Sequence, residues 1–293
     1  MLLLVDLDGV VYRGAEPVPG VAEALAERAR LGDDIVYVTN NSMFYRTAYL
    51  ARLTEMGAPV APDRVVSSAR ATALWISERL PDVRRVLTVG AGGLERELRD
   101  VGLDVVAAAH AATRYSQEGI DGFAAANHPD AVVAGLDPQV TYARLAVAAD
   151  CIRAGAKFIA TNRDATYPDA RGLRPGAGSI VAAIEVAAGT RPVAEIGKPG
   201  PLLLEEAARA AGRSASEAVM IGDALTDVAA GRAVGAQTIL MLTGVTTAER
   251  LATVPEELRP TVVAADASEL LAALERMAAS ASEPAVRKSA PTG

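Results

Sequence analysis

Cysteine and histidine are scarce in this chain of 293 residues, which contains one cysteine and two histidines. A single cysteine cannot form an intramolecular disulfide bond, and we interpret Cys151 as a packing residue in a reducing compartment. His110 and His128 stand outside the spacings that are typical of metal ligands. The sequence therefore predicts neither a disulfide-stabilised fold nor a zinc site.

Aromatic residues, basic clusters and long uncharged runs are also few. Aromatic side chains make up 4% of the chain, and no stretch is long and uncharged enough to cross a bilayer. Asp6 and Asp8 interrupt the first apolar run, which is unlike a signal peptide. The formal net charge is −7 without a basic patch, so we expect neither nucleic acid nor membrane as a partner. We expect a cytoplasmic protein.

Short apolar runs alternate with helical patterns along most of the chain, in which 51% of the residues are hydrophobic. The runs that we interpret as buried strands are 2–5, 35–38, 85–89, 131–134, 157–160, 217–221 and 238–242. Such alternation predicts an α/β protein built from doubly wound, Rossmann-like parallel sheets with helices on both faces. The segment 107–129 breaks the rhythm and is expected to be irregular, and 279–293 is expected to be disordered.

Four segments place small polar or charged residues directly after an apolar run. They are Asp6/Asp8, Thr39-Asn40-Asn41, Gly197-Lys198-Pro199 and Gly222-Asp223. Each alone is ordinary turn chemistry or a solvated charge. In a doubly wound sheet, however, all four would lie along one edge, within reach of one ligand.

The chemistry of these segments is complementary. Asp6, Asp8 and Asp223 supply the hard oxygen ligands that Mg²⁺ prefers. Thr39 offers a hydroxyl group, and the loop behind it offers backbone N–H groups, for phosphate oxygens. The Lys198 ammonium could neutralise a phosphate and a neighbouring carboxylate together. The set predicts a magnesium-dependent phosphate site.

Taken in order, these motifs resemble those of the haloacid dehalogenase superfamily. The stretches that carry the resemblance are DLDGVVYRG at 6–14, VTNNS at 38–42, VVAGLDPQVTY at 132–142, GAKFIATNRD at 155–164, PGAGSIVAAIEVAAG at 175–189, IGKPGP at 196–201 and GDALTD at 222–227. The chain is most similar to the class IIA phosphatases, which include nitrophenyl-, phosphoglycolate and glycerol-phosphate phosphatases. The resemblance covers about residues 1–277.

The resemblance implies a catalytic core formed by residues 1–81 and 191–278, with an α/β cap inserted at 82–190. It implies that the cap selects the substrate, and a homodimer formed through the cap is a further expectation. The implied activity is Mg²⁺-dependent hydrolysis of small phosphomonoesters through an aspartyl-phosphate intermediate.

The same resemblance implies the roles of individual residues. Asp6 would be the nucleophile, and Asp8 would protonate the leaving alkoxide and then deprotonate water. Thr39, Asn40, Asn41 and Lys198 would bind the phosphate group. Asp6, the Asp8 carbonyl group and Asp223 would hold Mg²⁺.

Two assignments rest on weaker patterns. The last motif has three residues between Asp223 and Asp227 where class IIA members usually have four, so Asp227 is either a metal ligand or a helix-capping acid. In the cap, the loop Arg163-Asp164-Ala165-Thr166-Tyr167-Pro168 and the turn Arg171–Gly178 are candidates for substrate selection, with Arg163 and Tyr167 as substrate-binding residues. Tyr167 and Arg171 either meet the leaving group or pack within their loops.

Three other functions stay open. Gly90-Ala91-Gly92-Gly93 invites a dinucleotide-binding interpretation, but Glu95 stands where the third glycine of that fingerprint belongs. A non-catalytic phosphometabolite-binding module is a second alternative. Transfer of the phosphoryl group to an acceptor other than water, as in mutases, is the third.

Overall fold

The computed structural model describes residues 1–169 and 172–282 and contains two parallel β-sheets. The first sheet has six strands in the order β15-β14-β13-β1-β4-β5, and the second has five in the order β12-β9-β8-β6-β7. Their strands are β1 (Leu2–Asp6), β4 (Asp34–Thr39), β5 (Val65–Ser67), β6 (Arg85–Val89), β7 (Asp104–Ala107), β8 (Ala131–Ala134), β9 (Lys157–Ala160), β12 (Ala194–Glu195), β13 (Ala218–Gly222), β14 (Gln237–Met241) and β15 (Val262–Ala264). The predicted parallel α/β architecture is confirmed.

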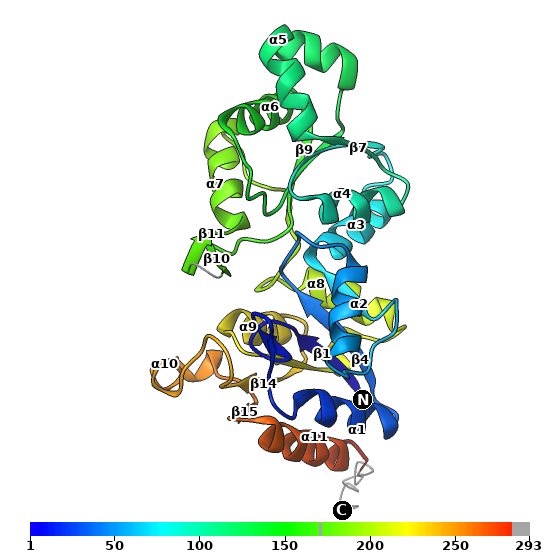
Figure 1. Ribbon diagram of the computed structural model, residues 1–293, viewed down its shortest axis with the longest axis vertical. Helices are drawn as coiled ribbons and strands as arrows, with labels where there is room; N and C mark the ends of the chain where they lie inside the picture. Colours follow the sequence, from blue (N-terminus) through cyan, green and yellow to red (C-terminus); the bar gives the residue numbers. More distant parts are fainter. Residues whose placement is uncertain (170–171, 283–293) are drawn as a thin grey trace, which may run out of the picture.

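Helices connect the strands and cover both sheets (Figure 1). They are α1 (Val21–Arg30), α2 (Arg46–Glu55), α3 (Ser68–Arg79), α4 (Gly92–Asp100), α5 (Ala108–Asn127), α6 (Tyr142–Arg153), α7 (Ala177–Ala188), α8 (Leu202–Ala210), α9 (Leu225–Ala233), α10 (Ala248–Ala252) and α11 (Ala267–Ser282). Two small hairpins pair β2 (Tyr12–Arg13) with β3 (Glu16–Pro17) and β10 (Thr166–Asp169) with β11 (Gly172–Pro175).

The core forms because every residue of β1 is buried and successive side chains point to opposite faces of the sheet. Leu3 and Val5 pack with side chains of α1 and α11 on one face. Leu2 and Leu4 pack with α3 and α8 on the other face, and this cluster continues to Val86 of the second sheet. The two sheets therefore share one apolar cluster, while α5, α6 and α7 cover the far face of the second sheet.

Three segments differ from the expectations drawn from the sequence. The segment expected to be irregular forms α5, which is kinked at Gly119 (φ 70°). Its alanine content favours a helix even though its polar residues blur the periodic pattern. Strand β12 pairs with β9, so the second sheet extends past residue 190 to Glu195. Helix α11 reaches Ser282, inside the stretch 279–293, and residues 283–293 lie outside the described ones.

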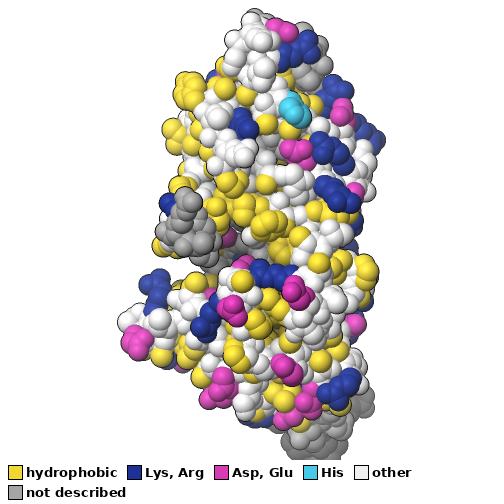
Figure 2. Space-filling model, viewed as in Figure 1, with side chains coloured by type: hydrophobic (Ala, Val, Ile, Leu, Met, Phe, Trp, Pro, Cys, Tyr) yellow, Lys and Arg dark blue, Asp and Glu magenta, His cyan; other side chains and the backbone are white. Residues whose placement is uncertain are grey.

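Charged side chains of both signs are interspersed over the face shown in Figure 2, without a large patch of one sign. Among the residues that the structure describes, none of the helices combines the length and apolar character needed to span a bilayer.

Candidate active site

The four polar strand ends meet at one edge of the first sheet. β1 lies between β4 and β13, so Asp6 at the end of β1 is flanked by Thr39 and by Gly222 with Asp223 behind it. Lys198 reaches the same place from the connection between β12 and α8. Parallel strands produce this convergence because all their carboxyl ends point the same way.

The Lys198 ammonium group lies between two buried carboxylates. Its Nζ atom is 2.5 Å from Asp6 Oδ1 and 2.6 Å from Asp227 Oδ1. Burial disfavours the charged amine, but Asp227 and Asp6 outweigh burial and raise the pKa of Lys198, which stays protonated. Burial raises the pKa of Asp6, Lys198 opposes this, and the neighbouring carboxylates of Asp227 and Asp223 add to it.

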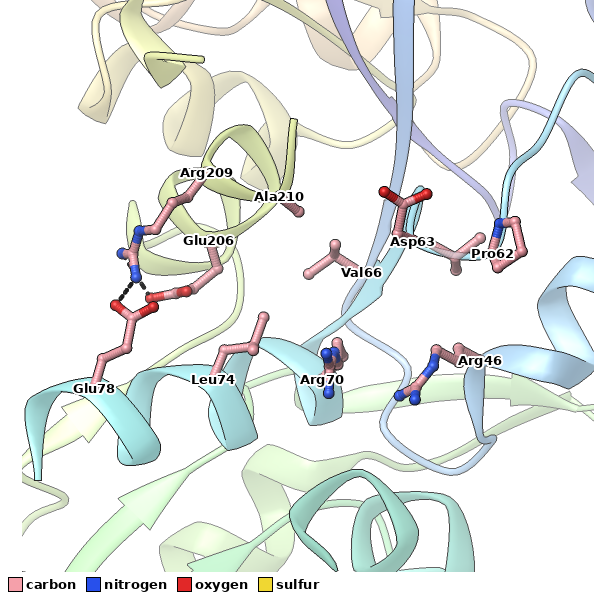
Figure 3. A pocket seen from close by; sticks show the side chains of 11 residues that line it. Arg46, Pro62, Asp63, Val66, Arg70, Leu74, Glu78, Glu206, Arg209 and Ala210 are labelled. Atoms are coloured by element: carbon pink, nitrogen blue, oxygen red, sulfur yellow. Dashed lines mark hydrogen bonds and ion pairs between the residues drawn. The ribbon is translucent and has the colours of Figure 1, made fainter. Parts of the chain in front are cut away.

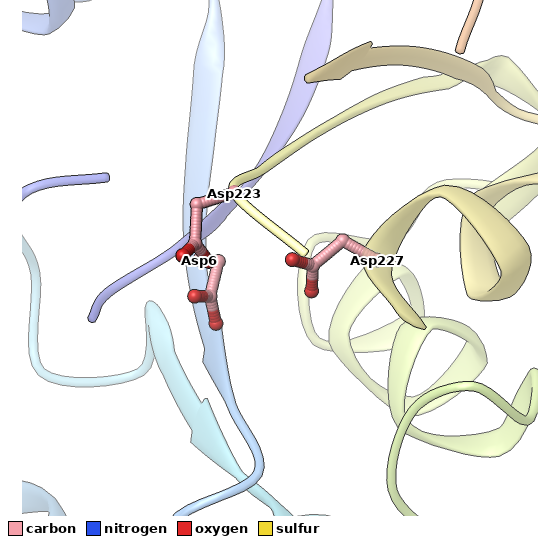
Figure 4. A group of neighbouring side chains, drawn as sticks. All are labelled: Asp6, Asp223 and Asp227. Atoms are coloured by element: carbon pink, nitrogen blue, oxygen red, sulfur yellow. The ribbon is translucent and has the colours of Figure 1, made fainter. Parts of the chain in front are cut away.

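Asp6, Asp223 and Asp227 form a carboxylate cluster, with one oxygen from each lying within 4.8 Å of the others (Figure 4). Burial and then the charge of Asp227 raise the pKa of Asp223 to about 6, although its Oδ2 atom accepts a hydrogen bond of 2.6 Å from the Val245 amide. Three carboxylates face one ammonium group here, so a divalent cation would balance the charge. Oxygen ligands of this kind fit Mg²⁺.

Glycines allow the backbone to approach this cluster. A Cβ atom at Gly244 would lie 1.8 Å from Asp223 Oδ2, and one at Gly9 would lie 2.3 Å from the same oxygen. A Cβ atom at Gly222 would lie 2.2 Å from Cβ of Asp227. Of these glycines, Gly244 was not singled out from the sequence, because its segment carries no acidic or basic residue.

Asp8 is exposed in the turn that follows β1. Desolvation by the surrounding protein raises the pKa of Asp8, and the positive charges of Arg52 and Lys198 oppose that shift. Arg52 belongs to α2, and no motif in the sequence connects it with Asp8. The one feature of the sequence that could have identified Arg52 is its place on the helix that directly follows the Thr39 segment.

Asn40 connects the first sheet to the Lys198 segment. Its Oδ1 atom accepts a hydrogen bond of 2.8 Å from the Lys198 amide, and its Nδ2 atom donates one of 2.9 Å to the Lys198 carbonyl oxygen. Thr39 Oγ1 accepts from the Asn41 amide at 3.1 Å, and Asn41 Oδ1 accepts from the Met43 amide at 2.9 Å. The amide group of Asn40 is thus occupied by partners within the protein.

The loop after β9 of the second sheet lies against this segment. Asn162 Nδ2 donates to the Asn40 carbonyl oxygen at 2.7 Å, and Asn40 Nδ2 lies 3.1 Å from both carboxylate oxygens of Asp164. Burial raises the pKa of Asp164, opposed by the Asn40 hydrogen bond and by Lys198. Asp164 belongs to the loop predicted to select the substrate, but its contact with Asn40 was not predicted, because an acidic residue in a loop usually faces solvent.

The other residues proposed for the cap are placed differently. Arg163 Nη2 forms ion pairs with Glu185 at 2.6 Å and Glu195 at 2.7 Å. Its charge is therefore already matched within the second sheet and its helices, residues 85–195, which we call the second-sheet half. Tyr167 of β10 is half-buried and packs beside the apolar cluster under α6 and α7. Arg171 lies outside the described residues.

A cavity of about 490 Å³ lies away from the strand ends, between α3, α8 and β5 (Figure 3). Arg209 extends from α8 and pairs with Glu78 of α3 and with Glu206 at 3.0 Å. Arg46 and Arg70 line the opposite end and contact Glu97. These charges are matched within the protein, and none of the predicted site residues lines the cavity.

Comparison with known proteins identifies the family. The model of haloacid dehalogenase-like hydrolases matches residues 3–104, and a second haloacid dehalogenase hydrolase model matches residues 195–270. An acid sugar phosphatase of Staphylococcus epidermidis is 37% identical over 274 residues, which cover 93% of this chain and 97% of the relative. The chain belongs to the haloacid dehalogenase superfamily.

Solved structures agree with this assignment to the haloacid dehalogenase superfamily. A p-nitrophenyl phosphatase from Archaeoglobus fulgidus has a TM-score of 0.81 at 32% identity and covers 93% of this chain and 98% of its own. A glycerol phosphate phosphatase from Mycobacterium tuberculosis, in complex with magnesium, has a TM-score of 0.77 at 36% identity. The match covers 92% of this chain and 75% of the phosphatase chain. The predicted family is confirmed, and this protein is a phosphatase.

Proposed function

We propose that this phosphatase hydrolyses small phosphomonoesters with Mg²⁺ and forms an aspartyl-phosphate on Asp6. The observation that carries the proposal is the Lys198 ammonium group held 2.5 Å from the buried Asp6 carboxylate, beside Asp223. A carboxylate in this position is ready to attack phosphorus, and the ammonium group would stabilise charge on the phosphate oxygens.

Asp6, the Asp8 carbonyl group and Asp223 would hold the metal ion. When bound, Mg²⁺ would shield the anionic phosphate from the anionic nucleophile. Asp227 completes the cluster and pairs with Lys198 at 2.6 Å, so we assign to it the orientation of the ammonium group as well as charge for the ion. The magnesium complex of the glycerol phosphate phosphatase supports the choice of metal.

The residues would act in two steps. An Asp6 oxygen forms a bond to phosphorus while the bond to the leaving oxygen breaks, and Asp8 gives its proton to that oxygen. Water then attacks phosphorus, Asp8 accepts the proton from water, and inorganic phosphate leaves with the Asp6 carboxylate restored. Thr39 would bind a phosphate oxygen, with the Asn40-Asn41 segment lining the site, and Asn40 would keep the Lys198 backbone in place.

The second sheet and its helices would form the cap. We propose that the inserted cap occupies about residues 82–190 with its last strand reaching Glu195, and that the core comprises 1–81 and the chain after the cap. The loop that contains Asp164 and Tyr167 would meet the leaving group. The relatives are named for sugar, nitrophenyl and glycerol phosphates, which supports a small phosphorylated metabolite as substrate. A cytoplasmic location and a homodimer through the cap stay predictions.

Asp6→Asn tests this proposal. We expect kcat with p-nitrophenyl phosphate to fall by about 10³-fold or more, because the amide is a poor nucleophile. The thermal unfolding midpoint should show that the fold is kept. Asp137→Asn is the matched control, because Asp137 is also buried and paired, with Arg144 at 2.8 Å, but lies in the second-sheet half.

Two results would contradict the proposal. One is an Asp6→Asn variant that turns over at the wild-type rate, and the other is wild-type protein that retains no ³²P on Asp6 after acid quenching. Addition of an alcohol acceptor separates hydrolysis from phosphotransfer: we expect release of inorganic phosphate, whereas a mutase-like enzyme would form a new ester.

A further inference from the structure

Arg52 of α2 is a half-buried cation that has no carboxylate within ion-pair distance among the residues the structure describes. Its guanidinium carbon lies 3.4 Å from the centroid of the Tyr12 ring. The Tyr12 ring is almost fully covered, since Tyr12 is 1% exposed, and Arg52 is part of that cover. A guanidinium group stacked on an aromatic ring is held in a defined plane, which a solvated arginine is not.

Tyr12 closes the turn that carries Asp8. The amides of Val11 and Tyr12 donate to the Leu7 carbonyl oxygen at 2.9 and 3.2 Å, and the Gly9 amide donates to the Tyr12 carbonyl oxygen at 2.7 Å. Asp8 and Tyr12 also form an isolated β-bridge. A contact that fixes the Tyr12 ring therefore fixes the backbone from which the Asp8 carboxyl group extends.

Arg52 is therefore connected to Asp8 through direct contacts. It stacks on the Tyr12 ring, and the backbone of Tyr12 bridges to that of Asp8.

We propose that Arg52 is a positioning residue for Asp8: stacked on Tyr12, it holds the turn at residues 7–12 and keeps the Asp8 carboxyl group directed at the leaving-group oxygen. The inference rests on the proposed function, in which Asp8 protonates that oxygen. Loss of Arg52 should lower the rate most for the esters whose leaving group depends most on protonation.

The experiment compares esters with leaving groups of different quality. The kcat/KM of the wild type and of Arg52→Gln is measured with p-nitrophenyl phosphate, phenyl phosphate and an alkyl phosphate. We expect the variant to stay within about twofold of the wild type on the nitrophenyl ester and to lose about 10- to 100-fold on the alkyl ester. Arg52→Lys, which keeps a cation over the ring, should recover most of the loss.

Two further variants show whether the effect passes through Asp8. In an Asp8→Asn background, Arg52→Gln should cause no additional loss on the alkyl ester, because interacting residues are not additive. Arg96→Gln is the matched control, since Arg96 stacks on the Tyr45 ring at 3.8 Å and lies on α4, away from the strand ends. It should leave the leaving-group dependence unchanged.

The outcomes are distinct. Equal loss on all three esters would show that Arg52 acts on substrate binding in general and not through Asp8, and wild-type kcat/KM on all three esters would show that it has no part in catalysis; either result overturns the inference. If Arg52→Gln does not fold, Arg52→Met is measured in the same way. Failure of the proposed function is seen separately, as an active Asp6→Asn variant or a wild type without Mg²⁺-dependent activity.

Discussion

Asn40 and Asp164 face each other across the junction of the two sheets, with Nδ2 of Asn40 at 3.1 Å from both carboxylate oxygens of Asp164. The same Asn40 amide group bonds to both backbone groups of Lys198. One side chain at the end of β4 thus connects the second-sheet half to the lysine that pairs with Asp6. The placement of the two sheets and the geometry of the site are coupled at this point.

Loss of the Asp164 carboxylate should disturb Lys198 through this contact. We expect Asp164→Ala to lower kcat/KM by about 10- to 100-fold, because the Asn40 amide group loses the partner that orients it. Asp164→Asn, which can still accept one hydrogen bond, should lose less. Steady-state kinetics with p-nitrophenyl phosphate measures kcat/KM of both variants. Asp137→Asn is the control and should behave as the wild type. Wild-type kinetics in Asp164→Ala would show that the contact is dispensable.

Removal of the metal should abolish activity and reduce stability. We expect protein treated with EDTA to be inactive, and Mg²⁺ to restore turnover and to raise the thermal unfolding midpoint as its concentration exceeds the dissociation constant. Asp223→Asn should lose most of that rise. Because the pKa of Asp223 is raised to about 6, protons compete with the ion, and Mg²⁺ should bind more weakly as the pH falls below this value. An Asp223→Asn variant with wild-type Mg²⁺ affinity would contradict the assignment.

Glu97 should contribute to stability through its position between the sheets. It is fully buried on α4, accepts from the Arg46 amide at 3.2 Å, pairs with the Arg46 side chain, and lies 3.6 Å from Arg70. We expect Glu97→Gln to lower the free energy of unfolding by about 2 kcal/mol. The cost is moderate because Arg46 and Arg70 are 22% and 25% exposed and can be solvated when unpaired.

Urea unfolding measures the effect of Glu97→Gln. The matched control is Glu95→Gln on the same helix, whose exposed partner Arg99 lies 3.1 Å away. Exposed pairs of this kind contribute about 0.3–0.5 kcal/mol. Equal losses in the two variants would show that burial of the Glu97 contacts adds nothing.

Glu206 should make stability depend on pH. Arg209 lies 3.0 Å from Glu206 and also pairs with Glu78 (Figure 3). Burial raises the pKa of Glu206 from 4.5 to about 7, the charge of Arg79 opposes this shift, and the charge of Glu205 adds to it. Between these two values the folded protein keeps a proton that the unfolded chain has lost. The contribution of Glu206 to stability is therefore present below about pH 4.5 and is lost as the pH rises to about 7, by at most on the order of 3 kcal/mol.

Glu206→Gln tests whether Glu206 lowers the free energy of unfolding as the pH rises, because glutamine has a similar shape but does not ionise. We expect the variant to match the wild type in unfolding free energy at pH 4.5 and to exceed it by about 1–2 kcal/mol at pH 8. Glu78→Gln, on the exposed side of the same arginine, should show no such trend. A Glu206→Gln variant that is less stable than the wild type at pH 8 would contradict the prediction.

Local patterns predicted much of the fold and of the site. The apolar runs of β1 and β4 identify buried strands because burial on both faces requires continuous hydrophobic residues. Asp6, Lys198 and Asp223 stand out because each follows such a run, and the structure brings them together. The segment that forms α5 was mispredicted, since its apolar residues, mostly alanine, produce a weak periodic signal.

The sequence by itself determined the parallel α/β architecture, the family and the acidic strand ends, because these depend on the order and spacing of residues close together in the chain. Only the tertiary structure decided that Asp164 contacts Asn40, that Arg163 pairs with Glu185 and Glu195, and that Arg52 stacks on Tyr12. In the sequence such charged residues are indistinguishable from solvated surface groups. Their partners lie on other elements, and burial and pairing are set only when those elements pack together.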